Sequence, residues 1–137
     1  MITLKLIKYL QLPSIGGLRF GHEDRISYHF SVMLRQAYIE GRINAVFTHI
    51  ANEAKSSVLA GKLRKAIGML PGAADWIIAN SEVTLFIELK AGKNKQSEAQ
   101  KLFQDLCIRA GIPYYVCYSV EEAESVLIRH NILKPKI

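Results

Sequence analysis

The stretch from Asp75 to Lys90 constrains the fold of this chain most strongly. It holds two runs rich in β-forming residues, 75–79 and 83–90, separated by three polar residues. Because so short a connection joins antiparallel neighbours, the two runs predict a β-hairpin. The hairpin would place the start of the first strand level with the end of the second.

Other elements are predicted on both sides of the hairpin by hydrophobic periodicity and by helix-stopping glycines. The predicted helices cover 22–40, 55–67, 97–110 and 119–130, and further strands cover 2–12, 43–50 and 113–118. Two helices have apolar stripes that we expect to face inward. These stripes are Ile26, Phe30, Met33 and Ala37 in the first helix, and Leu59, Leu63, Ala66 and Ile67 in the second.

The domain organisation follows from the length of 137 residues, which suits one domain with a hydrophobic core. We expect residues 1–20 to be an N-terminal extension and possible dimerisation segment, 21–131 to be the main domain and 132–137 to be a basic tail. No stretch is typical of a signal peptide or a membrane span. Cys107 and Cys117 lack metal-type spacing, and two buried, reduced thiols favour a cytoplasmic protein.

The charge balance is basic, with 18 Lys and Arg against 12 Asp and Glu, for a net charge of +6. Such a surplus favours a polyanionic partner, nucleic acid before an anionic membrane, although a merely soluble basic protein fits equally well. The helix predicted over 55–67 carries Lys55, Lys62, Arg64 and Lys65 and no acid. We interpret it as a phosphate-facing surface; the alternative is an ordinary solvated helix face.

Glu88 and Lys90 are the charged residues of the second hairpin strand. Strand alternation places Leu85, Ile87 and Leu89 on one face and both charges on the other. Burying charge in an apolar strand is costly unless the charge is paired or binds a metal. The alternative is an exposed edge strand with a harmless Glu–Lys pair.

Asp75 stands at the start of the first hairpin strand, where the hairpin would bring it level with Glu88. Two converging carboxylates repel each other and so favour a bound divalent cation. Oxygen ligands with room for water suit Mg²⁺ or Mn²⁺. The alternative is that Asp75 only caps its own turn.

Three further polar residues are candidates with alternatives of their own. Ser97 and Gln100 have capping-box spacing, so Gln100 either fixes the helix start or supports the site. Glu23 points toward the buried side of its helix; either it has a functional role there, or it is a first-turn acid that interacts favourably with the helix dipole. His49 precedes the basic helix and is more often a structural residue.

Taken in order, these residues resemble the VRR-NUC domain, a branch of the PD-(D/E)xK nuclease superfamily. The likeness covers roughly 22–127 of the chain. It rests on Pro71-Gly72-x-x-Asp75, Phe86-Ile87-Glu88-Leu89-Lys90 and Ser97-x-x-Gln100-Lys101, and it extends to His49-Ile50-x-Asn52-Glu53, Gly68, Ala110-Gly111 and Ser119-x-Glu121-Glu122-Ala123. The family usually has proline where Ala74 stands and glutamine where Ser27 stands.

The resemblance implies an α/β fold with a restriction-endonuclease-like αβββαβ core, a central mixed sheet flanked by helices. It implies a DNA endonuclease that uses Mg²⁺ or Mn²⁺ and no organic cofactor. Small stand-alone members come from phages and bacteria, and they are associated with homodimers that cut branched DNA such as four-way junctions. We therefore expect DNA as the partner, a homodimer, no membrane, and a cytoplasmic location.

The resemblance also implies roles for individual residues. Asp75 and Glu88 match the metal-binding acids, and Glu23 matches the first-helix glutamate. Lys90 matches the catalytic lysine, and Gln100 the glutamine after it. The Leu89 carbonyl completes the expected metal ligands. The expected DNA contacts are His49, Asn52, Lys55, Lys62, Arg64 and Lys65.

Two other functions stay open from the sequence. One is a catalytically silent, basic nucleic-acid-binding module on a nuclease scaffold. The other is a metal-dependent hydrolase of small phosphoesters. The intact acids and lysine weigh against the first, and the cationic helix weighs against the second.

Overall fold

A computed structural model of the chain describes residues 2–50 and 57–137, which fold as two compact units. The first unit comprises Met1–Ala45, Leu89–Gly92 and Cys117–Ile137, and the second comprises Val46–Glu88 and Lys93–Val116. Within the described ranges, no helix is both long enough and apolar enough to span a membrane.

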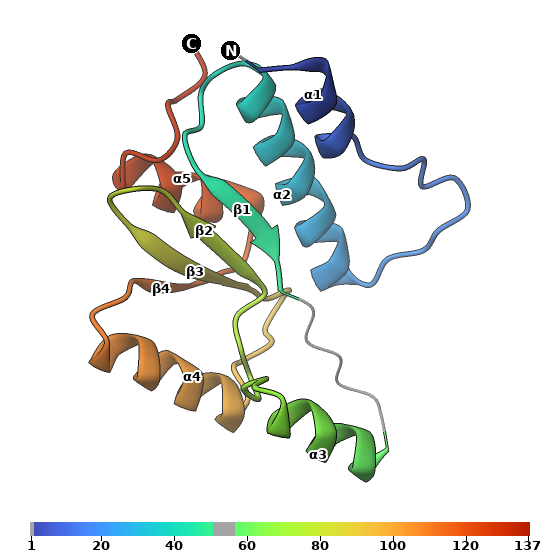
Figure 1. Cartoon of the computed structure of the whole chain (residues 1–137), viewed down its shortest axis with the longest axis vertical. Helices are drawn as coiled ribbons and strands as arrows, with labels where there is room; N and C mark the ends of the chain where they lie inside the picture. The colour runs from blue at the N-terminus through green and yellow to red at the C-terminus, as the bar shows by residue number, and fades with distance from the viewer. Residues whose placement is uncertain (1, 51–56) are drawn as a thin grey trace. The chain divides into compact units, whose positions relative to one another are not determined.

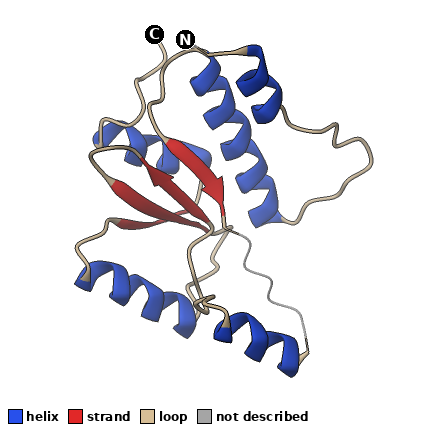
Figure 2. Cartoon of the chain, in the orientation of Figure 1, coloured by secondary structure: helices blue, strands red, loops and turns tan. Residues whose placement is uncertain are grey.

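The second unit is built on a four-stranded sheet in the order β1-β2-β3-β4 (Figure 2). The strands are β1 (Val46–His49), β2 (Trp76–Ala79), β3 (Thr84–Leu89) and β4 (Tyr114–Cys117). Strands β1, β2 and β3 pair antiparallel. Strand β4 runs parallel to β3, because the backbone N–H groups of Phe86 and Lys90 donate to the carbonyls of Pro113 and Cys117, at 3.0 and 2.9 Å. The sheet is therefore mixed, as predicted.

The β2–β3 hairpin is confirmed. Its turn is held by Asn80, whose side-chain oxygen accepts hydrogen bonds from the N–H groups of Glu82 and Val83, at 2.9 and 3.0 Å. The strands pair Trp76 with Ile87 and Ile78 with Leu85. These four side chains lie on one face and are 0–3% exposed. Alternation along the strands therefore directs the intervening residues to the opposite face.

Helix α4 (Glu98–Arg109) packs against that opposite face of the sheet. Phe103 of α4 meets Phe86 of β3 edge to face, with ring centroids 5.2 Å apart. Ala74 and Cys107 complete the buried centre of this cluster. With helix α2 before β1, the order is αβββαβ, with α3 inserted between β1 and β2 (Figure 1). The predicted α/β fold is thus confirmed.

Helix α3 (Val58–Ala66) differs from its prediction. It starts after Ser57, whose hydroxyl accepts a hydrogen bond from the N–H of Ala60. The inward orientation expected for its apolar stripe is wrong, because Leu59, Leu63 and Ile67 are 77%, 62% and 73% exposed and no α3 residue is buried. Periodicity identifies an apolar helix face, but it does not show that anything covers that face.

The helices of the first unit, among its described residues, are α1 (Leu4–Leu10), α2 (His22–Ile39) and α5 (Val120–Arg129). Helix α2 packs against α5, and both were predicted. Phe30 and Ala37 of the predicted stripe are fully buried, and Leu34 joins them. The two cysteines, Cys107 in α4 and Cys117 at the end of β4, are free and buried, as predicted.

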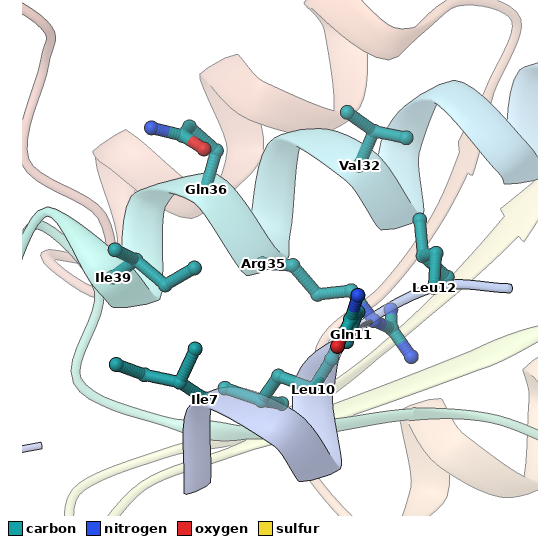
Figure 3. A pocket seen from close by; sticks show the side chains of 8 residues that line it. All are labelled: Ile7, Leu10, Gln11, Leu12, Val32, Arg35, Gln36 and Ile39. Carbon is teal, nitrogen blue, oxygen red and sulfur yellow. Dashed lines mark hydrogen bonds between the residues drawn. The ribbon is translucent and has the colours of Figure 1, made fainter. Parts of the chain in front are cut away.

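Helix α1 corrects the strand predicted for residues 2–12. The Thr3 hydroxyl caps the helix by accepting from the N–H of Leu6. The alternation that suggested a strand was too short to exclude a helix, and Ile7 and Leu10, three residues apart, face α2 across a cavity of about 220 Å³ (Figure 3). Arg35 of α2 extends to the end of α1, where its Nε donates to the Leu10 carbonyl at 2.7 Å.

Candidate metal and phosphate site

The hairpin register places Asp75 opposite Glu88. The last paired residues of β2 and β3 are Trp76 and Ile87, and Asp75 and Glu88 are the next residues along each chain. The backbone of Asp75 continues the sheet on its other side, since its carbonyl accepts from the N–H of Ile50 at 2.6 Å. Both acidic residues therefore occupy the face that α4 covers.

Tyr114, the first residue of β4, lies near enough to both carboxylates for their charges to act on its phenol. Burial raises the pKa of its phenol to about 12; a hydrogen bond with Gln96 opposes this shift, and the charges of Glu88 and Asp75 add to it. The Gln96 side-chain nitrogen lies 3.3 Å from the phenol oxygen. One phenol on the neighbouring strand thus senses both acids, and it stays protonated at neutral pH.

Tyr114 and Gln96 were not predicted from the sequence. Tyr114 directly follows Pro113 at the start of a predicted strand, but the sequence does not reveal which strand β4 pairs with. The parallel pairing with β3 turns Tyr114 toward Phe86 and the α4 cluster. That pairing sets Tyr114 beside Phe86, two residues before Glu88 on β3.

Glu88 and Lys90 are both buried, with 2% and 8% of their surfaces exposed. Strand β3 is an inner strand, flanked by β2 and β4. The alternative of an exposed edge strand is therefore wrong. A carboxylate and an ammonium kept from water at an inner strand are costly to hold there, so they need compensating partners.

Gln100 of α4 supplies one such partner and caps its helix as well. Its side-chain oxygen accepts from the N–H of Ser97 at 2.8 Å, while the Ser97 hydroxyl accepts from the N–H of Gln100 at 3.2 Å. Because the amide oxygen is used in this capping box, the amide nitrogen is directed to Glu88 Oε2, 3.0 Å away. The two interpretations of Gln100 are thus compatible, since one side chain makes both contacts.

Gly72 explains the Pro-Gly turn that precedes Asp75. It has a positive φ of 74°, which favours glycine. A Cβ at this position would also collide with the backbone of Ala99 and Gln100 in the first turn of α4. The absence of a side chain therefore lets the turn touch the helix start, and this contact fixes Asp75 relative to Gln100.

The two carboxylates fit a hard divalent cation. Among the residues that the structure describes, no group of three or more His, Cys, Asp and Glu side chains is arranged to hold a metal. Mg²⁺ is commonly held by only one or two carboxylates, and waters and substrate phosphates complete its shell. Asp75 and Glu88 match that requirement. The roles of Glu23, partly buried in the first turn of α2, and of the Leu89 carbonyl stay predictions.

The predicted DNA contacts fall in β1, in α3 and outside the described ranges. His49 ends β1, is exposed and meets Trp76 edge to face, with ring centroids 5.6 Å apart. On α3, Lys62 and Lys65 are exposed and Arg64 is partly buried. Asn52 and Lys55 lie outside the described residues. DNA binding by all of these residues stays a prediction.

The domain has a mixed sheet whose β2–β3 hairpin carries both acids, and helix α4 places Gln100 against Glu88. This is the α/β fold of the restriction-endonuclease-like class that the sequence predicted. A solved structure described as "VRR_NUC domain protein" shares this fold, with a TM-score of 0.58 and 21% sequence identity over 82% of this chain and 89% of the other. No protein-family model matches the sequence, and no curated protein matches it. The resemblance to the VRR-NUC domain therefore holds at the level of the fold.

Proposed function

We propose that this protein is a divalent-metal-dependent DNA endonuclease that acts on branched or structured DNA such as four-way junctions. The observation that carries the proposal is the placement of Asp75 opposite the buried Glu88, with Gln100 bonded to Glu88. The fold shared with a VRR_NUC domain protein supports it. The cofactor would be Mg²⁺ or Mn²⁺, the ions that suit a small set of carboxylate oxygens.

Asp75 and Glu88 would hold the ion, with the Leu89 carbonyl and Glu23 as further ligands. When bound, the ion would supply Lewis-acid stabilisation of the developing phosphate charge and activation of the attacking water. Gln100 would keep the Glu88 carboxylate in one orientation. Strand alternation, continued one residue past β3, would project Lys90 to the same side as Glu88, where its ammonium would orient the water and contact the phosphate.

Tyr114 would add a neutral donor to this site. Its pKa of about 12 keeps the hydroxyl protonated at physiological pH, so it can donate a hydrogen bond to a phosphate oxygen without adding negative charge. Tyr114→Phe keeps the ring in the α4 cluster and removes the hydroxyl, and with it both this donor and the acceptor of the Gln96 hydrogen bond.

The test is a nicking assay on linear, nicked, flap, fork and four-way-junction DNA with Mg²⁺ and with Mn²⁺. Glu88→Gln and Asp75→Asn should abolish cleavage while DNA binding is kept. Glu98→Gln is the matched control, because Glu98 is an acid near Gln100 on α4 and its side chain is 88% exposed. Cleavage by Glu88→Gln at the wild-type rate would remove the basis of the proposal. Binding without nicking under every condition would instead favour the silent binding module.

We also propose a homodimer, since one small domain with one metal site cuts one strand and a symmetric junction needs a twofold partner. Exposed apolar side chains on two helices support it: Leu4 and Tyr9 on α1 are 77% and 82% exposed, and α3 exposes Leu59 and Leu63. Sizing of the wild type and of Leu4→Glu/Tyr9→Glu and Leu59→Glu/Leu63→Glu variants tests which helix pairs. A wild type that is monomeric at high micromolar concentration would contradict the proposal.

A further inference from the structure

An apolar cavity of about 320 Å³ lies beside the carboxylates in the second unit. Its walls include Met69, Leu70, Ala73, Phe86 and Phe103, and all of its lining side chains are apolar. Its volume falls at the lower end of the range for small-ligand sites, roughly 300–1,000 Å³. The proposed metal chemistry makes no use of this cavity.

Three segments place the cavity next to the metal site, because each contributes one residue to the cavity and a neighbouring residue to the site. Ala73 lines the cavity and Asp75 follows it by two residues. Phe86 lines it and Glu88 follows on the same face of β3, about 7 Å along the strand. Phe103 lines it one helical turn after Gln100 on α4.

The cavity therefore lies within the length of one nucleotide of the carboxylates, where a phosphate would be held. The only large apolar surface of a nucleotide is the face of its base. Phe86 and Phe103, set edge to face, offer aromatic surface of the kind on which bases stack without sequence preference. A base can enter only after it leaves its own stack, which costs least at mismatched, damaged or unpaired positions.

We propose that the cavity binds an unstacked nucleobase next to the scissile phosphate. This proposal rests on the proposed nuclease function and refines it. The protein would select structured DNA because a branch point offers a base that is free to leave the helix. With only apolar side chains on its walls, the cavity would accept any of the four bases.

The test fills the cavity by Leu70→Trp, at a position that is 49% exposed and so tolerates a larger side chain. Leu106→Trp is the matched control, since Leu106 is 51% exposed on α4 and does not line the cavity. Each protein is assayed on a four-way junction with an intact base, or with an abasic site, next to the mapped cut.

Leu70→Trp should lower kcat/KM on the intact junction by roughly 5- to 150-fold, the range expected for one lost base–aromatic stack. Wild type should lose a similar factor on the abasic junction, and there the substitution should have no further effect. Leu106→Trp should match wild type. An equal loss by Leu70→Trp on intact and abasic junctions would overturn the cavity proposal and leave the nuclease proposal in place.

A binding measurement separates the two proposals if no DNA is cut. Asp75→Asn protein is mixed with a junction that carries 2-aminopurine next to the branch, and fluorescence is compared with and without Leu70→Trp. A fluorescence change that Leu70→Trp removes supports the cavity whatever the cleavage result. DNA binding with the same fluorescence in both proteins, or no DNA binding at all, overturns it.

Discussion

Gln100 makes two contacts that can be separated by substitution. Its oxygen accepts from the Ser97 N–H, and its nitrogen donates to the Glu88 carboxylate. Gln100→Glu would keep an acceptor for the Ser97 N–H, since capping boxes also use glutamate. It would replace the amide that donates to Glu88 with a second carboxylate. Ser97→Ala would do the reverse, removing the helix cap while leaving the Glu88 contact in place.

The magnitudes follow from burial. The Gln100 hydrogen bond ends on the Glu88 carboxylate, which is only 2% exposed. Hydrogen bonds to charged groups contribute about 1.5–3 kcal/mol. If losing this hydrogen bond raises the activation free energy by the same amount, Gln100→Glu should lower kcat/KM by roughly 10- to 150-fold. Ser97→Ala should cost about 1 kcal/mol in the free energy of unfolding and leave kcat/KM within about threefold of wild type.

The assay is single-turnover nicking of the preferred DNA over a range of Mg²⁺ concentrations, together with urea unfolding of each variant. The deficit of Gln100→Glu should shrink as Mg²⁺ rises, because the ion offsets the added negative charge. Equal losses of activity in Gln100→Glu and Ser97→Ala would mean that Gln100 only caps the helix, and the reasoning would be refuted.

Three further predictions concern the fold and the basic helix. Gly72→Ala should destabilise the protein by roughly 1–3 kcal/mol or more, because Gly72 has a positive φ and a Cβ there would collide with α4. Gly61→Ala should stabilise the protein by up to about 1 kcal/mol, because Gly61 lies inside α3 with open space around it. Urea unfolding measures both changes. Burial raises the pKa of Cys117 from its ordinary value of 9.0 to about 11, so the unfolded thiol loses its proton first as pH rises. The free energy of unfolding should therefore be constant below pH 9 and should fall by roughly 2–3 kcal/mol as the pH rises towards 11. In thermal unfolding at a series of pH values, Cys117→Ala should flatten this dependence. Lys62→Glu/Lys65→Glu should weaken DNA binding and reduce the slope of log K against log salt by up to about 2; an unchanged slope would exclude α3 as a phosphate-binding surface.

The sequence predicted the parts of the site that depend on local pattern. Alternation placed Glu88 on the face of β3 opposite Ile87, and the short polar connection placed Asp75 across from Glu88. Capping-box spacing located the start of α4 at Ser97. Each of these follows from residues within one element or one turn, where the side-chain period is fixed by backbone geometry.

The remaining features depend on contacts between distant segments. Tyr114 joins the site only because β4 pairs parallel to β3, and Gly72 matters only because the turn touches α4. The exposed stripe of α3, with Leu59 and Leu63, shows the same limit, since amphipathic spacing describes a helix and not its surroundings. In α1, seven residues were too few for period 2 and period 3.6 to be distinguished.

The hairpin has two ends of very different mutational tolerance. At the Asp75 end, Gly72 leaves no room even for a methyl group, so an insertion there would separate the acid from the helix that orients its partner. At the far end, Ser81 and Glu82 are exposed in a turn that Asn80 closes with its own side chain. A tag or fluorophore carried at Ser81 would therefore report on the protein without disturbing its chemistry.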